Sequence, residues 1–394
     1  MSKNLKIHYP LTYPSWNRLE EKAILDVIKS NQYTYKKKVL QFENNFSKYH
    51  NLKYGTMVNS GSSANLLAVS SLFYKKNNPL KKGDEVIVPA ISWSTTYFPL
   101  TQNNLKLKIV DVDFSTVNID VEKIEKAITK KTKLIVVVNI LGNPCDLSKI
   151  KQICDRKGIY LMEDNCESLG AIIDKKKTGT FGIINTFSFF YSHHISTIEG
   201  GMILTNNLEL NEIIRSLRSH GWTRDSLTKK SFFKKKRKTK FENYKFLLPG
   251  YNLRPTEINA ATGIIQLKKL DNFIKLRRKN FYYYQNIFKD NKIFHIQKEN
   301  GKSSAFSFIF IFKKKFLHLK DKIYNLMSKN NIQYRLITGG CILKHPVIKL
   351  LDHEIYKNTN NANYIHENGF FLGNSHEDLK NQLIRFNKII TELY

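Results

Sequence analysis

Short apolar runs rich in β-branched residues alternate with stretches of helical spacing between Lys53 and Asn206. The strands predicted from these runs are Tyr54–Val58, Glu85–Val88, Leu107–Val110, Leu134–Val138, Ile159–Met162, Thr186–Phe190 and Met202–Thr205. The helices predicted between them are Ser62–Tyr74, Thr95–Gln102, Val121–Ile128 and Leu147–Cys154. Strands that alternate with helices predict crossover connections and a mainly parallel sheet covered on both faces.

A second pattern begins at Pro255, which stands near the first position of a long helical stretch that ends at about Ile287. A β-rich run at Phe306–Phe312 follows, then a predicted helix at Leu319–Asn330 and a final one at Glu377–Leu393, which Ser375 is expected to cap. We therefore expect an α/β fold with a large domain at residues 1–255. Residues 256–394 are expected to form a long linking helix and a small α+β domain.

The formal net charge of +31 raises the question of nucleic acid. The lysines are spread along the whole chain in short runs, which favours a solvated surface over a nucleic-acid site. The densest run, Lys229 to Lys240, indicates a surface loop that could attract an anionic substrate. We expect no nucleic-acid partner.

Membrane and metal sites are also not expected. No apolar run reaches the ~20 residues of a membrane span, and no signal peptide precedes the first predicted strand, so we expect a cytoplasmic protein. The four cysteines form no C-x-x-C pair. We therefore expect neither a metal site nor a disulfide.

Two segments at predicted strand ends carry groups suited to an anionic ligand or a ring. Asn59–Asn65 is a glycine- and serine-rich turn between a strand and a helix, where free N–H groups can bind phosphate. An ordinary helix cap explains the same serines. Glu163–Ser168 places Asp164 at the exit of a buried strand, where its carboxylate needs a partner. A protonated ring nitrogen and a helix cap are both suitable partners.

Two further segments complete the candidate chemistry. Ser188–Gly201 holds the adjacent histidines His193 and His194 between two strands, with hydroxyls nearby, and a histidine can exchange protons near neutral pH. Leu248–Glu257 is a turn that opens the long helix, and helix capping does not account for its Asn252 and Arg254.

The four segments, in this order and spacing, resemble the sugar aminotransferases of the DegT/DnrJ/EryC1/StrS group. The resemblance covers essentially the whole chain, with further support at Ser92–Tyr97, Leu141–Pro144 and His220–Arg224. It implies the aspartate-aminotransferase type of fold (pyridoxal-phosphate fold type I) and action on nucleotide-linked sugars. In that group a lysine five residues after the serine of the third segment bonds to the cofactor. Here the position five after Ser188 is His193, as in the group's dehydratase branch.

The resemblance implies cofactor contacts position by position. Ser62 and Ser63 would hold the phosphate through their turn, and Ser188 would hold it through its hydroxyl. Asn252 would reach the phosphate bound to a neighbouring subunit, because active sites in this group form across a homodimer.

The remaining implied roles concern the cofactor ring and the substrate. Trp93 would stack on the ring and Asp164 would pair with its nitrogen. Glu167, where aminotransferases usually have Gln, would face the ring hydroxyl. Candidate substrate contacts are His194, His220, Arg224 and Arg254.

The histidine in place of lysine implies a non-covalently bound pyridoxal or pyridoxamine phosphate, with His193 as the catalytic base. The expected reaction is loss of the C3 hydroxyl from a nucleotide-linked 4-keto-6-deoxy sugar, with GDP-4-keto-6-deoxy-D-mannose as the expected substrate. Glutamate would restore the amine form of the cofactor. The product would be a precursor of a dideoxysugar such as colitose.

Three alternatives remain open. A sugar aminotransferase is disfavoured by the missing lysine. A CDP-sugar dehydratase with an iron–sulfur cluster is disfavoured because Cys145, Cys154, Cys166 and Cys341 are too scattered for that cluster. A non-catalytic binding protein is disfavoured by the intact phosphate, ring-nitrogen and stacking positions. His194 competes with His193 for the role of base.

Overall fold

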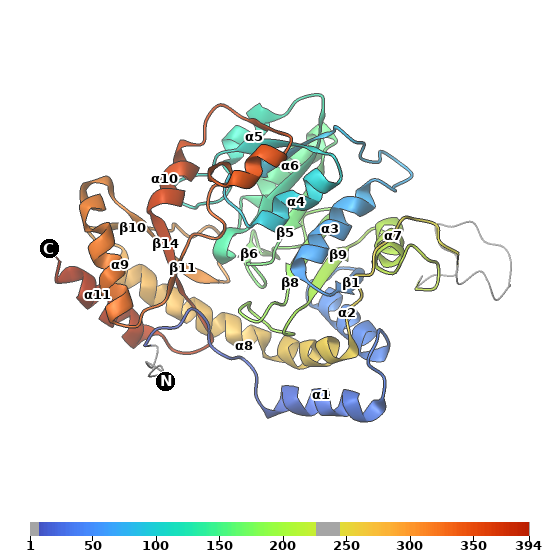
Figure 1. The fold of residues 1–394 in the computed structure, drawn as a ribbon, viewed down its shortest axis with the longest axis horizontal. Helices are drawn as coiled ribbons and strands as arrows, with labels where there is room; N and C mark the ends of the chain where they lie inside the picture. Colours follow the sequence, from blue (N-terminus) through green and yellow to red (C-terminus); the bar gives the residue numbers. More distant parts are fainter. Residues whose placement is uncertain (1–7, 226–244, 394) are drawn as a thin grey trace.

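The computed structural model describes residues 8–225 and 245–393, and within these two ranges eight strands form one large sheet (Figure 1). Their order across the sheet is β1-β9-β8-β5-β4-β2-β3-β13. In chain order the strands are β1 Tyr54–Val58, β2 Glu85–Pro89, β3 Lys106–Val110, β4 Thr132–Val138, β5 Tyr160–Asp164, β8 Ile184–Ser188, β9 Gly201–Thr205 and β13 His353–Ile355.

The central strands, from β13 through β3, β2, β4 and β5 to β8, pair in parallel. Strand β9 runs antiparallel to both β8 and β1 at one edge. The predicted mainly parallel sheet is therefore confirmed. Because parallel strands share one direction, β4, β5 and β8 deliver their carboxyl ends to the same edge of the sheet, where ligands of such sheets bind.

Helices cover both faces of this sheet, as the apolar runs predict. Along β2, Val86 and Val88 pack into the cluster that includes Leu67 of α3 (Gly61–Leu72), while Ile87 packs into the cluster of Ile150 on α6 (Leu147–Lys157). Both faces of the strand are thus buried, which explains an uninterrupted apolar run in place of an alternating one. The other covering helices are α4 Ser94–Gln102, α5 Val121–Ala127 and α7 Leu208–Arg218.

The long helix α8 (Glu257–Phe288) runs below the large sheet toward the small one, and α1 (Arg18–Ser30) and α2 (Lys37–Tyr49) pack on it (Figure 1). Pro255 was expected near the first helical position, and this is wrong. The helix cap is Thr256, whose side chain accepts the N–H of Asn259, so Pro255 lies just before the cap. The start of the helix is therefore set by a side-chain hydrogen bond.

The small sheet is antiparallel in the described part of the chain, with the order β10-β11-β14-β12. Its strands are β10 Phe294–Ile296, β11 Ser307–Phe312, β12 Tyr334–Leu336 and β14 Gly369–Gly373, accompanied by α9 Lys320–Lys329, α10 Asn360–Asn368 and α11 Lys380–Thr391. Strand β13 leaves this region and joins the large sheet beside β3. We keep the division at 255/256 as a proposal.

Two predicted boundaries are corrected. Helix α11 begins at Lys380 after Leu379 and has no side-chain cap, so Ser375 does not cap it. The Ser375 hydroxyl instead accepts the N–H of Glu377 in the preceding turn. The predicted strand Thr186–Phe190 ends at Ser188, and Phe190 is exposed. Among the described residues, no helix combines the length and the apolar character that crossing a membrane requires.

Candidate active site

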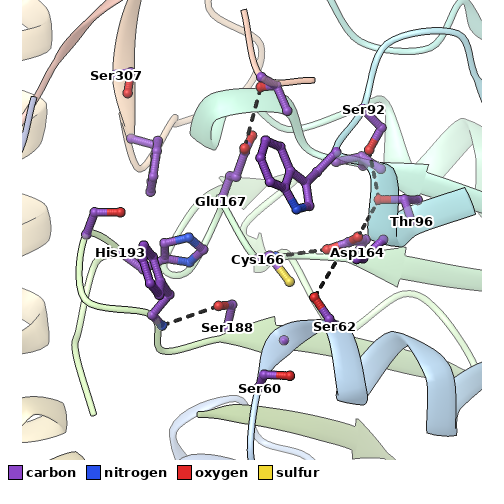
Figure 2. Close-up of a pocket in the computed structure, with 18 of the residues that line it drawn as sticks. Ser60, Ser62, Ser92, Thr96, Asp164, Cys166, Glu167, Ser188, His193 and Ser307 are labelled. Carbon is purple, nitrogen blue, oxygen red and sulfur yellow. Dashed lines mark hydrogen bonds between the residues drawn. The ribbon is translucent and has the colours of Figure 1, made fainter. Parts of the chain in front are cut away.

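A cavity of about 520 Å³ lies beyond the carboxyl ends of β4, β5 and β8, next to the first turn of α3. Figure 2 shows His193 on one side of this cavity and Asp164 on the other, with Glu167 and Ser188 between them. The small sheet closes the cavity through residues such as Ser307 and Phe371. The fold thus brings together residues from the first three of the four segments singled out in the sequence.

The first turn of α3 forms one end of the cavity. Ser60 caps the helix by accepting the N–H of Ser63, and the Ser62 hydroxyl donates to Thr95 Oγ1 at 3.0 Å. A Cβ atom on Gly61 would lie 2.5 Å from the Cβ of Ser188, so only glycine lets Ser188 approach this turn. Ser63 does not line the cavity, and its hydroxyl accepts from that of Ser60 at 3.0 Å. Ser62 and Ser188 therefore frame a helix N-terminus suited to an anion.

Asp164 is buried at the end of β5, with 4% of its surface exposed. Its Oδ2 accepts from Asn65 Nδ2 at 2.8 Å and from Thr96 Oγ1 at 2.9 Å, and its Oδ1 accepts the N–H of Cys166 at 3.1 Å. Neither Asn65 nor Thr96 was predicted as a site residue. These three hydrogen bonds fix the orientation of the carboxylate.

Glu167 and Trp93 line a further part of the cavity. Glu167 Oε2 accepts the N–H of Leu141 at 2.9 Å. Burial, with the nearby charge of Asp164 adding to it, raises the pKa of Glu167 to about 7. Trp93 has 54% of its surface exposed, so its indole has a face free for a ring to stack upon.

The two adjacent histidines have different surroundings. His193 lines the cavity, its ring stands edge-on to Phe306 at 5.2 Å, and its Nδ1 has no hydrogen-bond partner among the described residues. His194 is buried and does not line the cavity, and its Nε2 lies 3.2 Å from the carbonyl oxygen of Ser304. Burial lowers the pKa of His193 to about 4, and burial also lowers the pKa of His194. Both imidazoles are therefore neutral near pH 7.

The other predicted contacts gather around Trp222, away from the cavity of their own chain. The Arg224 and Arg254 guanidinium carbons lie 5.4 and 5.8 Å from the Trp222 ring centre, and the His220 ring lies 5.3 Å from it. Arg254 Nε donates to Asn252 Oδ1 at 3.1 Å. We name His220, Trp222, Arg224, Asn252 and Arg254 the Trp222 cluster. The Lys229 to Lys240 run lies outside the described residues.

Arg335 is a site residue that the sequence did not reveal. It lies on β12, opposite Phe371 of β14, and both residues line the cavity. Within the described part of the chain, Arg335 is the only lysine or arginine of that lining, and it makes no hydrogen bond or ion pair there. Its signal in the sequence was weak, because Arg335 stands in a short exposed strand without a motif.

The residues present fit pyridoxal phosphate. The turn that Gly61 keeps narrow suits a phosphate, the buried Asp164 suits a ring nitrogen, and Trp93 offers an aromatic wall. No lysine lines the cavity in the ranges that the structure describes, so a cofactor there would be held without a covalent bond.

Comparison with known proteins gives the same picture. GDP-4-keto-6-deoxy-D-mannose 3-dehydratase of Escherichia coli O55:H7 is 46% identical over 96% of this chain and 98% of its own. A structure of the E. coli enzyme with bound hydrated PLP matches with a TM-score of 0.95 and 46% identity, covering 97% of this chain and 99% of that one. A third match, GDP-4-keto-6-deoxymannose-3-dehydratase with a trapped adduct of PLP and glutamate, has a TM-score of 0.95 and 45% identity over 97% and 100% of the two chains.

These matches confirm the aspartate-aminotransferase type of fold that the resemblance implied. The sequence profile described as the DegT/DnrJ/EryC1/StrS aminotransferase family matches residues 14–386, which is nearly the whole chain. The chain therefore belongs to the DegT/DnrJ/EryC1/StrS aminotransferase family.

Proposed function

We propose that this protein is a pyridoxamine-phosphate-dependent 3-dehydratase of GDP-4-keto-6-deoxy-D-mannose, with glutamate as the amino donor. One observation carries the proposal: His193 lines the cavity at the position where the family's aminotransferases have their lysine. Relatives 46% identical over nearly the whole chain that bear this enzyme's name support it. The product would supply a dideoxysugar such as colitose.

Ser62 and Ser188 would bind the phosphate of the cofactor, Trp93 would face its ring, and Asp164 would hold its ring nitrogen protonated. When bound, the cofactor supplies an amine for the C4 ketone of the sugar and an electron sink in its ring. Glu167 would face the ring hydroxyl. Its pKa of about 7 allows this carboxyl to share a proton with that oxygen at neutral pH.

His193 would move the protons of the reaction. Its neutral imidazole can accept a proton from the C4′ carbon of the cofactor, and the resulting imidazolium can donate a proton to the C3 oxygen as it leaves the sugar. The low pKa of His193, about 4, keeps the imidazole in the accepting form near pH 7 and makes its conjugate acid a strong donor. His194 lies outside the cavity lining, which supports the assignment of proton transfer to His193.

We assign Arg335 to the carboxylate of glutamate, because it is the only lysine or arginine that lines the cavity in the described part of the chain. We expect Arg335→Gln to lower kcat/KM for the glutamate half-reaction by ~10- to 100-fold, since a hydrogen bond between charged groups contributes ~2 kcal/mol. Single-turnover dehydration by enzyme preloaded with the amine form should change by less than about 3-fold, because no carboxylate binds in that step.

Stopped-flow absorbance of the cofactor measures both half-reactions of the Arg335→Gln variant. Calorimetry with 2-oxoglutarate adds a direct measure of dicarboxylate binding. Arg385→Gln is the matched control, since Arg385 lies on α11 and does not line the cavity. A larger loss in the sugar half-reaction than in the glutamate half-reaction would assign Arg335 to the diphosphate and contradict the proposal.

We infer a homodimer in the cytoplasm. The residues of the Trp222 cluster do not line the cavity of their own chain, and the Asn252 amide and the two arginines suit the phosphate groups of a ligand bound to a second copy. The four cysteines are unpaired thiols, as is usual in a reducing compartment. Sedimentation equilibrium tests the assembly, and a monomeric mass at working concentration would exclude it.

The activity itself is tested by incubating the full-length protein with pyridoxal phosphate, glutamate and GDP-4-keto-6-deoxy-D-mannose. We expect mass spectrometry to show a nucleotide-sugar product lighter by one oxygen atom. An aminated product would mean that the protein is a transferase, which is the alternative left by the family. An unchanged sugar, with CDP- and dTDP-linked sugars unchanged as well, would reject the dehydratase.

A further inference from the structure

Arg277 of α8 is a buried cation without an anion. Only 4% of its surface is exposed, and no carboxylate of the described ranges forms an ion pair with it. Its Nη1 donates to the carbonyl oxygens of Phe306 at 3.1 Å and Asn374 at 2.9 Å, and its Nε has no partner among the described residues. Burying an unpaired charge is costly, so a function that needs this charge is worth seeking.

The two residues that Arg277 holds both line the active-site cavity. Asn374 also donates to Arg277, because its Nδ2 lies 3.0 Å from the carbonyl oxygen of Arg277. The same Nδ2 donates to the carbonyl oxygen of Ala305 at 2.7 Å. The Phe306 ring stands edge-on to His193, with 5.2 Å between ring centres and 83° between planes. Arg277 therefore fixes the cavity wall against which the imidazole of His193 rests.

The charge of Arg277 also acts on His193. Burial is the main cause of the low pKa of His193, the backbone carbonyls of Cys166 and Ser188 oppose it, and the positive charge of Arg277 lowers it further. Other ionisable groups surround the cavity in front of His193, and His194 follows it in the chain. The groups in front are Asp164, Cys166, Glu167, Tyr191, Glu199 and Arg335.

We propose that Arg277 is a positioning residue for His193: through its hydrogen bonds to Phe306 and Asn374 it sets the Phe306 ring against the imidazole, and it places a buried positive charge near that imidazole. The proposal rests on the proposed role of His193 in proton transfer. The buried charge then has a chemical role, because a cation near the imidazole makes the imidazolium a stronger proton donor to the oxygen that leaves the sugar.

Arg277→Gln and Arg277→Lys separate the charge from the hydrogen bonds. Glutamine keeps a donor for the two carbonyls and removes the charge, whereas lysine keeps the charge. We expect the titration midpoint of His193 to rise by roughly half a unit or more in Arg277→Gln, because this variant removes a positive charge that disfavours the imidazolium. It should stay close to the wild-type value in Arg277→Lys.

The midpoint is measured by NMR on the full-length protein with labelled histidine, both without cofactor and loaded with pyridoxamine phosphate. The His193 signal is assigned by its loss in His193→Asn. Arg278→Gln is the matched control, because this neighbouring arginine is half-buried and donates to the carbonyls of Ser303 and Gly170. A folded Arg277→Gln protein with an unchanged midpoint, or an equal shift in Arg278→Gln, would overturn the electrostatic role.

Phe306→Leu tests the positioning role and keeps the proposal testable if Arg277→Gln does not fold. It removes the ring and leaves the charge, so single-turnover dehydration should fall by ~10-fold while the His193 midpoint changes little. A wild-type rate in Phe306→Leu would overturn the positioning role. The NMR titration needs no substrate, so a protein that dehydrates no sugar would reject the proposed function and still report on Arg277.

Discussion

Replacing His193 with asparagine is expected to lower the rate of dehydration by ~10²- to 10⁴-fold, which is the usual contribution of a positioned acid–base group. The substitution keeps a polar side chain of smaller volume and removes the group that exchanges protons. Cofactor binding should persist, because Ser62, Ser188 and Asp164 remain in place. Single-turnover assays with enzyme preloaded with pyridoxamine phosphate measure the loss.

His194→Asn is the matched control for this prediction. His194 lies outside the cavity and bonds to the carbonyl of Ser304, so its loss should lower stability by ~1 to 3 kcal/mol and leave the rate nearly unchanged. Equal losses of rate in the two variants would remove the distinction that the structure draws between them. A greater loss in His194→Asn would make His194 the base.

A lysine at the same position gives the opposite chemistry. His193→Lys places an amine where the cofactor is expected, and burial should lower the pKa of that amine and favour its neutral, nucleophilic form. After incubation with pyridoxal phosphate and reduction with borohydride, we expect the mass of the protein to increase by that of the covalently attached cofactor. We also expect an aminated sugar product. A His193→Lys protein that still dehydrates at the wild-type rate contradicts the role of His193.

Asp164→Asn is expected to lower the rates of both half-reactions by ~10²- to 10³-fold. It removes the fixed negative charge of the carboxylate beside the cofactor ring, and that ring takes up the charge that develops during the reaction. Asparagine has nearly the shape of aspartate, so the loss reports on charge and not on volume. Both half-reactions should fall together, since each one needs a protonated ring nitrogen. This pattern differs from Arg335→Gln, which should affect the glutamate half alone.

Thr96→Val is the companion variant for Asp164. It removes the hydrogen bond from Thr96 to the carboxylate. The negative charge remains, and so do the hydrogen bonds from Asn65 and from the N–H of Cys166. We expect a loss of ~10-fold or less, in line with one hydrogen bond. If Asp164→Asn lost no more activity than Thr96→Val, the charge of Asp164 would not be essential.

Local patterns in the sequence determined most of the architecture. The apolar runs at β2, β4 and β5 predicted buried parallel strands, because a strand covered on both faces has no polar alternation to interrupt it. The same patterns placed Asp164 at the exit of a strand, and the spacing from Ser188 to His193 gave the departure from the family's lysine. These features depend on residues close together in the chain, where periodicity and spacing carry the information.

Helix starts were predicted less well. Pro255 and Ser375 were placed at helix starts on residue type alone, whereas Thr256 caps α8 and α11 begins after Leu379 without a side-chain cap. A cap depends on which backbone N–H a side chain reaches, and several nearby residues in each turn offer suitable groups. The fold selects among them through the way the helix packs.

Only the tertiary structure decided which groups meet in the cavity. Asn65, Thr96 and Arg335 come from three separate elements, so no spacing in the sequence connects them to Asp164 or His193. His193 and His194 are equivalent by position, yet one lines the cavity and the other contacts Ser304 behind it. The physical reason is that burial and side-chain direction arise from packing between distant segments, which a local pattern does not specify.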